Sequence, residues 1–280
     1  GTVRQAKATK RKKTSQVSYQ PRFKEAGKYA VYVSYQSLPK SVSDAKYIVY
    51  HKGEATEFSV NQRMGGGTWV YLGTFDFDKG CNEFNRVVCT NKASRRGVVT
   101  TDAVRFGGGM GNIERGGYTS GLPRCLEGAR YYAQWAGAPY KVYGGRKGEN
   151  DYADDINTRS LMTNWLGGGS VYMPAKNGKH VPIELSLALH SDAGYNKDGK
   201  STVGALAICT TDYNDGILNS GISRFTSKDF ARALRDNLVT DLTAQFGEFG
   251  KRYLWDRNYS ETRLPEVPSA ILEMLSHQNF

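Results

Sequence analysis

The segment Leu187-Ala-Leu-His190-Ser-Asp-Ala-Gly194 ends an alternating run that begins at Ile183. Apolar residues occupy every second position of 183–189, and this pattern predicts a strand with one buried face. His190 follows where the strand is expected to end, and ligands collect outside the carboxyl ends of strands in open α/β sheets. His190 is therefore a candidate metal ligand, although a histidine that is hydrogen-bonded at a loop start gives the same pattern.

A second segment, 263–279, places a carboxylate inside an apolar run. Two prolines lead into a short predicted strand, and Glu273 has apolar neighbours on both sides. A carboxylate in that setting must be paired, associated with a metal or protonated. A metal hydrolase would use both groups, His190 to hold the ion and Glu273 to take a proton from the bound water.

Both segments resemble those of zinc-dependent N-acetylmuramoyl-L-alanine amidases. The segment 187–194 is similar to the LHxDA or LHxNA segment of that family, and 267–279 is similar to its closing PAVLVELGFLSN segment. The resemblance covers roughly residues 120–280, with a further strand and helix expected between the two segments. It implies that His190 is a zinc ligand and that Glu273 is the catalytic carboxylate.

One departure from the family concerns the metal ligands. The family also uses an earlier His and an earlier Glu, and the first histidine of this sequence is His51, in a different kind of domain. The resemblance therefore implies the later half of such a fold, with an incomplete Zn²⁺ site, upstream ligands and weak or no activity by itself. Arg263 is a candidate for binding an anionic group of the substrate, and a structural salt bridge is the alternative.

Residues 17–107 have the pattern of an all-β domain. Short alternating runs are separated by turn signals such as Lys52-Gly53 and Asp78-Lys-Gly80, which favours a sandwich of the jelly-roll kind. The segments Ala26–Val33, Ala45–His51 and Thr101–Phe106 resemble the golvesin C-terminal-like domain. This resemblance implies a carbohydrate-binding-like role, and proteins that join such a domain to an amidase-like half are often labelled xanthan lyases.

Together these patterns predict two domains, an all-β sandwich followed by an α/β domain with a mostly parallel sheet. The expected parts are a basic segment (1–16), the sandwich (17–107), a Gly-rich linker (108–118) and the later half of an amidase-like domain (119–280). Helices are expected over 122–135, 154–166 and 227–246, the last with Ser227 as its cap.

The net charge of +11 comes in large part from the basic segment, which we expect to be solvated. No nucleic-acid-binding motif accompanies the basic segment, so we expect no nucleic-acid partner. No apolar run is long enough to span a membrane. Cys81 and Cys89 could face each other across a turn, and Cys209 is expected to be a buried thiol. Trp69 could stack on a sugar or pack in the core.

The sequence thus predicts part of an exported cell-envelope hydrolase that acts on peptidoglycan or another bacterial glycan. Two alternatives remain open at this point. One is a non-catalytic glycan-binding protein, and the other is a polysaccharide (xanthan) lyase, although no Tyr, His and Arg cluster typical of lyases is recognisable. The substrate, the glycan and the oligomeric state do not follow from the sequence.

Overall fold

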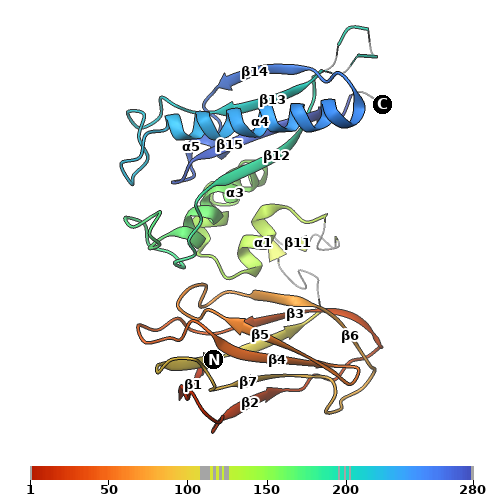
Figure 1. Ribbon diagram of the computed structural model, residues 1–280, viewed down its shortest axis with the longest axis vertical. Helices are drawn as coiled ribbons and strands as arrows, with labels where there is room; N and C mark the ends of the chain where they lie inside the picture. The colour runs from red at the N-terminus through yellow and green to blue at the C-terminus, as the bar shows by residue number, and fades with distance from the viewer. Residues whose placement is uncertain are drawn as a thin grey trace. The chain divides into compact units, whose positions relative to one another are not determined.

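The computed structural model describes residues 2–107, 114–115, 118–119, 122, 126–194, 196–198, 200–201 and 203–278. The chain divides into two compact units, Gly1–Ala138 and Pro139–Phe280 (Figure 1). No helix in these described ranges combines the length and the hydropathy that crossing a membrane requires.

The N-terminal unit is built from short antiparallel strands. They form a four-stranded sheet β2-β7-β4-β5, a three-stranded sheet β6-β3-β9 and a pair β1-β8. The strands are β1 (Arg4–Lys7), β2 (Gln16–Tyr19), β3 (Gly27–Ser34), β4 (Ala45–His51), β5 (Glu54–Val60), β6 (Val70–Phe77), β7 (Arg86–Thr90), β8 (Val98–Thr101) and β9 (Ala103–Phe106). This arrangement confirms the prediction of a β-rich fold.

The core of this unit lies between its two larger sheets. Val31 and Val33 of β3 belong to the same fully buried cluster as Tyr47 and Val49 of β4, which lies in the opposite sheet. Phe77 joins them with no exposed surface. Each aliphatic side chain buried in this way contributes about 1.5–3 kcal/mol to stability.

The cations of the basic segment are exposed, as expected, but part of the segment pairs with a strand of the N-terminal unit. Arg4–Lys7 forms β1 and pairs with β8, and Gln16–Tyr19 forms β2 and pairs with β7. Ala8 packs against the core. The lysines that suggested solvation lie in the exposed connection between these two strands.

Helix α1 (Ala129–Trp135) is shorter than the predicted 122–135 and belongs to the N-terminal unit. The indole of Trp135 lies 5.1 Å from the ring of Tyr32 and 6.5 Å from that of Trp69, between ring centroids. Trp69 therefore packs against protein. Because α1 belongs to it, the N-terminal unit ends later than predicted. The predicted linker 108–118 lies mostly outside the described residues, which include only β10 (Glu114–Arg115) and the start of β11 (Tyr118–Thr119) from this segment.

The C-terminal unit is a four-stranded sheet with helices. Its elements are α2 (Tyr140–Tyr143), α3 (Asp151–Gly167), β12 (Ser186–Asp192), β13 (Ala205–Cys209), α4 (Phe225–Phe246), β14 (Lys251–Asp256), α5 (Ser260–Arg263) and β15 (Ser269–Ser276). The strand order is β12-β15-β13-β14. The two outer pairs are parallel and the central pair β15-β13 is antiparallel. The sheet is thus mixed, and the predicted parallel order holds only for the outer pairs.

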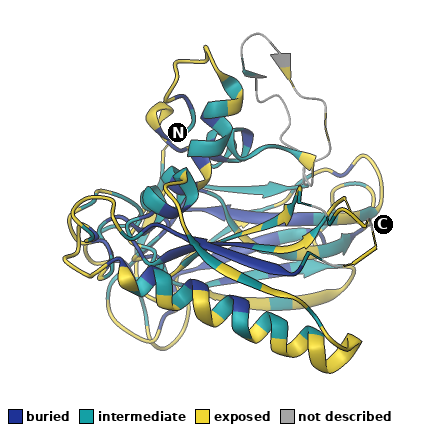
Figure 2. Ribbon diagram, turned by 90° about the horizontal axis from the view of Figure 1, so that it is seen from above, coloured by how far each residue is buried: buried dark blue, intermediate teal, exposed yellow. Residues whose placement is uncertain are grey.

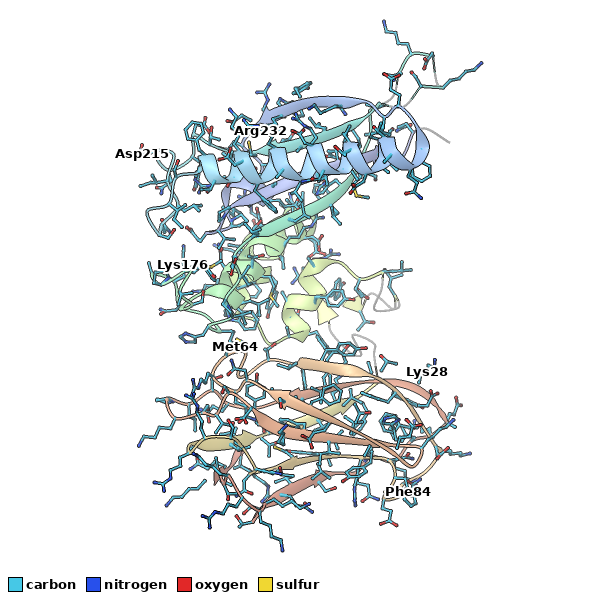
Figure 3. The ribbon with its side chains drawn as sticks, viewed as in Figure 1. Lys28, Met64, Phe84, Lys176, Asp215 and Arg232 are labelled. Atoms are coloured by element: carbon cyan, nitrogen blue, oxygen red, sulfur yellow. The ribbon has the colours of Figure 1, made fainter. Side chains whose placement is uncertain are left out.

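Helix α4 covers one face of this sheet. Phe230, Leu234 and Leu238 pack on a buried cluster that includes Ala207 and Leu272. The opposite side of the helix is exposed, as its colouring in Figure 2 shows. Arg232, labelled on α4 in Figure 3, belongs to this outward side.

The expected cap of α4 is wrong. The helix begins at Phe225, so Ser227 lies within its first turn. Ser227 is fully buried, and its hydroxyl accepts a hydrogen bond from the N–H of Ser269 at 3.1 Å. The hydroxyl of Ser227 therefore binds β15 and does not cap the start of α4 as the sequence pattern had predicted. Helix α3 also begins earlier than predicted, with the Asn150 side chain as its cap.

The cysteines that the structure describes are free thiols. Cys81 is exposed and Cys89 is buried, so the possible bridge between them does not form. Cys209 is fully buried in β13, as predicted. Cys125 lies outside the described residues.

Candidate functional site

His190 and Glu273 are direct neighbours in the sheet. Strand β12 runs parallel to β15, and the register places His190 opposite Glu273. Register partners point to the same face, and Nδ1 of His190 lies 3.8 Å from Oε1 of Glu273. The strand extends to Asp192, further than predicted, so His190 lies within it because its pairing with β15 continues through this position.

Glu261 approaches the other side of the imidazole. It belongs to α5, and its Oε2 lies 3.0 Å from Nε2 of His190. Its Oε1 accepts a hydrogen bond from Arg159 of α3 at 3.2 Å. Arg159 also pairs with Asp155, four residues earlier in α3, at 3.4 Å. The imidazole therefore lies between two carboxylates, and a guanidinium fixes the nearer of them.

All three side chains are shielded from water to different degrees. The exposed fraction is 32% for His190, 12% for Glu261 and 15% for Glu273. The arrangement leaves the imidazole the most accessible of the three groups. A carboxylate–histidine pair with this access resembles the orienting contacts that fix a histidine tautomer at functional sites.

Glu273 carries the clearest electrostatic perturbation. Burial raises the pKa of this carboxyl above its ordinary value, and the negative charges of Asp192 and Glu261 add to the rise, while His190 and Arg252 oppose it. Its Oε2 is buried and has no hydrogen-bond partner among the described residues. A carboxylate that lacks solvation in this way is a better proton acceptor than an exposed one.

Asp192 follows on the same strand but is held as an anion. Burial opposes its ionisation, but the N–H of Gly194 and the guanidinium of Arg252 outweigh burial and hold the pKa of Asp192 below its usual value. The N–H of Gly194 donates to Oδ1 at 2.7 Å, and Arg252 pairs with Oδ2. The environments of Asp192 and Glu273 thus push their pKa values in opposite directions, as in sites where two carboxyls have different roles.

The described residues do not fit a zinc ion on their own. Catalytic zinc sites use three protein ligands and a water molecule. Within the part of the chain that the structure describes, no group of three or more His, Cys, Asp or Glu side chains is arranged to hold a metal ion. A Zn²⁺ site at His190 therefore stays a prediction that requires ligands beyond these residues.

Arg263 is not brought into this cluster by its described contacts. Its guanidinium donates to Oδ1 of Asn258 at 2.8 Å, and its carbonyl accepts from Arg224 at 3.0 Å. The other histidines have described contacts: His51 with the hydroxyl of Thr56, His180 with the carbonyl of Gly169, and His277 with the hydroxyl and the carbonyl of Ser191.

The outer edge of β12 is apolar and uncovered. Leu187 and Leu189 lie opposite Ala270 and Leu272 in the register, which pack beneath α4. The exposed fractions are nevertheless 42% for Leu187 and 62% for Leu189, because α4 packs on β13, β14 and β15. Strand β12 pairs only with β15 in the described sheet, so its second edge presents unpaired backbone groups.

A match to a known family concerns the N-terminal unit. Residues 2–108 match the Golvesin C-terminal domain. This match covers the sandwich and extends to the basic segment, which contains β1. It bears out the resemblance of the first domain, whereas the resemblance of the C-terminal unit to amidases stays a prediction.

A similar curated protein is a xanthan lyase from Bacillus sp. strain GL1, 34% identical over 97 residues, which cover 34% of this chain and 10% of that protein. The chain thus spans about a tenth of that relative. Among solved structures, a Paenibacillus xanthan lyase matches with 27% identity, a TM-score of 0.32 and coverage of 35% of this chain and 9% of that one. A ruminal GH26 endo-β-1,4-mannanase matches with 12% identity, a TM-score of 0.25 and coverage of 67% and 29%. These TM-scores are too low to carry an argument.

Proposed function

We propose that the C-terminal unit provides the proton-transfer pair of a hydrolase that cleaves an amide bond in peptidoglycan, as N-acetylmuramoyl-L-alanine amidases do. One observation carries this proposal. A partly accessible histidine lies in register with a glutamate whose pKa is raised and whose Oε2 has no described partner. Such perturbed pairs occur at catalytic sites more often than elsewhere.

The residues divide the chemistry between them. Glu273 takes the proton of the water that attacks the amide carbonyl, and it returns a proton to the leaving nitrogen as the C–N bond breaks. Glu261 orients the imidazole of His190, so that one ring nitrogen is occupied and the other faces Glu273. The amide is thereby converted to a carboxylate and a free amine.

A Zn²⁺ ion belongs to this proposal only together with a further ligand. The open edge of β12 supports that extension, because the leucine row and the unpaired edge leave room for another strand beside His190. A strand added there would bring its side chains next to the imidazole, since adjacent strands lie about 4.8 Å apart. Without that ligand we expect weak activity at most.

The test uses peptidoglycan and the protein at its full natural length. Cleavage should release new α-amino groups of L-alanine, which amine labelling and mass spectrometry identify. The variant Glu273→Gln should lower the rate by about 10²–10⁴-fold, the usual contribution of a general base. Glu248→Gln serves as the matched control, because Glu248 is exposed and lies in the loop after α4. An unchanged rate in Glu273→Gln would contradict the proposal.

For the N-terminal unit we propose glycan attachment and, with it, an exported location at the bacterial cell envelope. The match of residues 2–108 to the Golvesin C-terminal domain and to a segment of xanthan lyase supports a role near polysaccharides. A non-catalytic glycan-binding protein is therefore the second candidate. It predicts retention on insoluble peptidoglycan that Glu273→Gln leaves unchanged.

The lyase alternative has less support, because the matched segment covers only 10% of the xanthan lyase. An ultraviolet-absorbing unsaturated product from xanthan would favour it over hydrolysis.

A further inference from the structure

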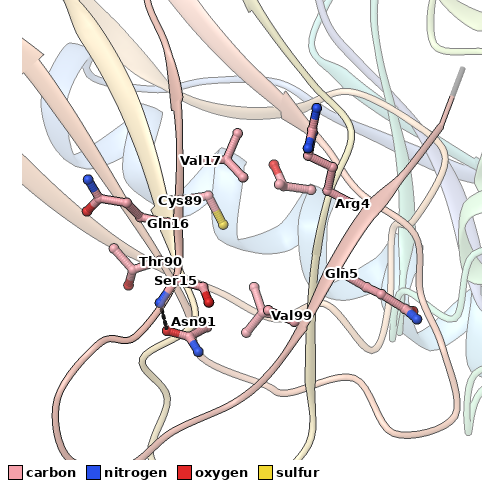
Figure 4. Close-up of a pocket in the computed structure, with 11 residues that line it drawn as sticks. Arg4, Gln5, Ser15, Gln16, Val17, Cys89, Thr90, Asn91 and Val99 are labelled. Carbon is pink, nitrogen blue, oxygen red and sulfur yellow. Dashed lines mark hydrogen bonds between the residues drawn. The ribbon is translucent and has the colours of Figure 1, made fainter.

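The N-terminal sandwich contains a cavity that the pair His190 and Glu273 does not use. Its volume is about 200 Å³, and strands β1, β2, β7 and β8 line it (Figure 4). Val17, Cys89 and Val99 contribute apolar surface, whereas Arg4 and Thr101 contribute a guanidinium and a hydroxyl. The lining thus combines a small apolar surface with donors and acceptors that suit a polar ligand.

Strand pairing fixes the positions of these groups. Arg4 is opposite Thr101 in the pair β1-β8, and Val17 is opposite Cys89 in the pair β2-β7. The hydroxyl of Tyr19 joins the two pairs by a 2.8 Å hydrogen bond to Oγ1 of Thr101. The cavity is therefore part of the folded framework of the sandwich.

A cationic loop begins beside this cavity. Lys10–Lys13 are four consecutive cations that join β1 to β2. The buried side chain of Asn91 fixes both ends of the loop, since its Oδ1 accepts from the N–H groups of Thr14 and Ser15 at 3.1 Å. Its Nδ2 donates to the carbonyl of Lys7 at 2.9 Å. These bonds hold the loop ends in place before any ligand arrives.

The charge of this region is not neutralised. Among the described residues, no carboxylate forms an ion pair with Arg4 or with any member of Lys10–Lys13. The ammonium of Lys13 donates instead to the amide of Gln16 at 2.8 Å, which connects the loop to the cavity. Four cations therefore gather in the loop and create a positive potential there, while Arg4 lies at the other end of β1, opposite Thr101.

We propose that this cavity and the loop Lys10–Lys13 bind an acidic polysaccharide. One sugar ring occupies the cavity with its carboxylate on Arg4, and the carboxylates of the next sugars lie along the loop. The inference deepens the proposed function, because it names the class of glycan that the sandwich holds. A guanidinium binds a carboxylate in a bidentate manner, and a hydroxyl side chain matches sugar hydroxyls.

Two features favour this ligand over others. The cavity is smaller than the roughly 300–1,000 Å³ that enclose drug-sized ligands, so it accommodates one ring of a chain. Its described lining contains no aromatic side chain, whereas single-stranded nucleic acid is bound by stacking its bases on aromatic rings.

The experiment measures binding of the whole chain to oligogalacturonate by calorimetry at low salt. The methyl-esterified oligosaccharide is the neutral control ligand, and single-stranded DNA of equal charge is the competitor. The test variant replaces Lys10, Arg11, Lys12 and Lys13 with Gln, and a second variant is Arg4→Gln. All five residues are exposed, so the fold should persist.

The control variant replaces Lys24, Lys28, Lys52 and Lys79 with Gln. It removes the same charge at the opposite end of the strands, where Lys28 is labelled in Figure 3. The register separates the two ends, because Lys46 of β4 pairs with Thr90 and Tyr50 pairs with Arg86.

We expect the loop variant to bind oligogalacturonate at least tenfold more weakly and the control variant to change affinity less than about threefold. Arg4→Gln should weaken binding several-fold. Equal losses in both quadruple variants, equal binding of the neutral ester, tighter binding of DNA or no binding at millimolar ligand would each overturn the inference. Glu273→Gln should bind like the natural chain, so failure here is distinguishable from failure of the hydrolase proposal.

Discussion

Replacing Glu273 with Gln should stabilise the C-terminal unit at neutral pH. Burial raises the pKa of this carboxyl, so the folded state binds its proton more tightly than the unfolded chain does. Above its ordinary pKa of 4.5 the unfolded chain releases this proton first, and folding stability therefore falls as the pH rises through the folded pKa. At more acidic pH both states are protonated, and the difference vanishes.

The size of this effect follows from the surroundings of the carboxyl. Each unit by which the folded pKa exceeds the unfolded one costs about 1.4 kcal/mol. Water reaches part of the side chain, which is 15% exposed, and the nearby imidazole offsets part of the cost. After that discount for screening, we expect Glu273→Gln to gain on the order of 1 kcal/mol, or about 2–4 °C in Tm.

The assay is chemical denaturation followed by tryptophan fluorescence at pH 4 and pH 8. The C-terminal unit contains Trp165 and Trp255, and Glu248→Gln gives the response of an exposed carboxyl. The variant should gain stability at pH 8 relative to pH 4. An equal effect at both pH values, or a loss confined to pH 8, would show that the carboxylate is well solvated or well paired and would refute the reasoning.

Two further predictions concern buried groups. Arg224 is 2% exposed and donates to two backbone carbonyls, so Arg224→Met should cost roughly 2–4 kcal/mol in chemical denaturation, whereas the exposed Arg232→Met should change stability by less than about 0.5 kcal/mol. In a Cys125→Ser background at pH 8, Cys81 should react at once with a thiol reagent. Cys89 should react only after unfolding, because burial raises its pKa to about 11, and a fast second thiol would contradict this.

The sequence predicted those parts of the structure that depend on local patterns of apolar and charged residues. Alternation predicted the strand that carries His190, and a carboxylate among apolar residues marked Glu273. The strand β1 within the basic segment was missed because it exists only through pairing with β8. The local composition of the basic segment favours solvation. The pairing of β1 with β8 is a long-range contact, and the four residues of β1 carry no sequence signal for it.

The remaining members of the cluster were missed for a related reason. Glu261 is 71 residues from His190 along the chain, and Arg159 is 102 residues from Glu261. Their meeting depends on how α3 packs against α5 and how α5 packs against β15. Contacts between short helices and a sheet depend on how several distant segments pack together, so they cannot be predicted from one segment alone.

Oε2 of Glu273, which has no described hydrogen-bond partner, and the exposed leucines of β12 both affect stability. Both lower stability in the described unit, since an unsatisfied buried polar atom costs about 1–3 kcal/mol and exposed leucine forgoes its burial. They occur within one strand pair, on opposite faces of neighbouring positions. The addition of a strand beside β12 would pair its open edge, lie next to the leucines on one face and bring new side chains next to His190 on the other. Stability and catalysis would then depend on the same contact. A peptide that pairs with β12 should protect the backbone N–H groups at the open edge of β12 from hydrogen exchange.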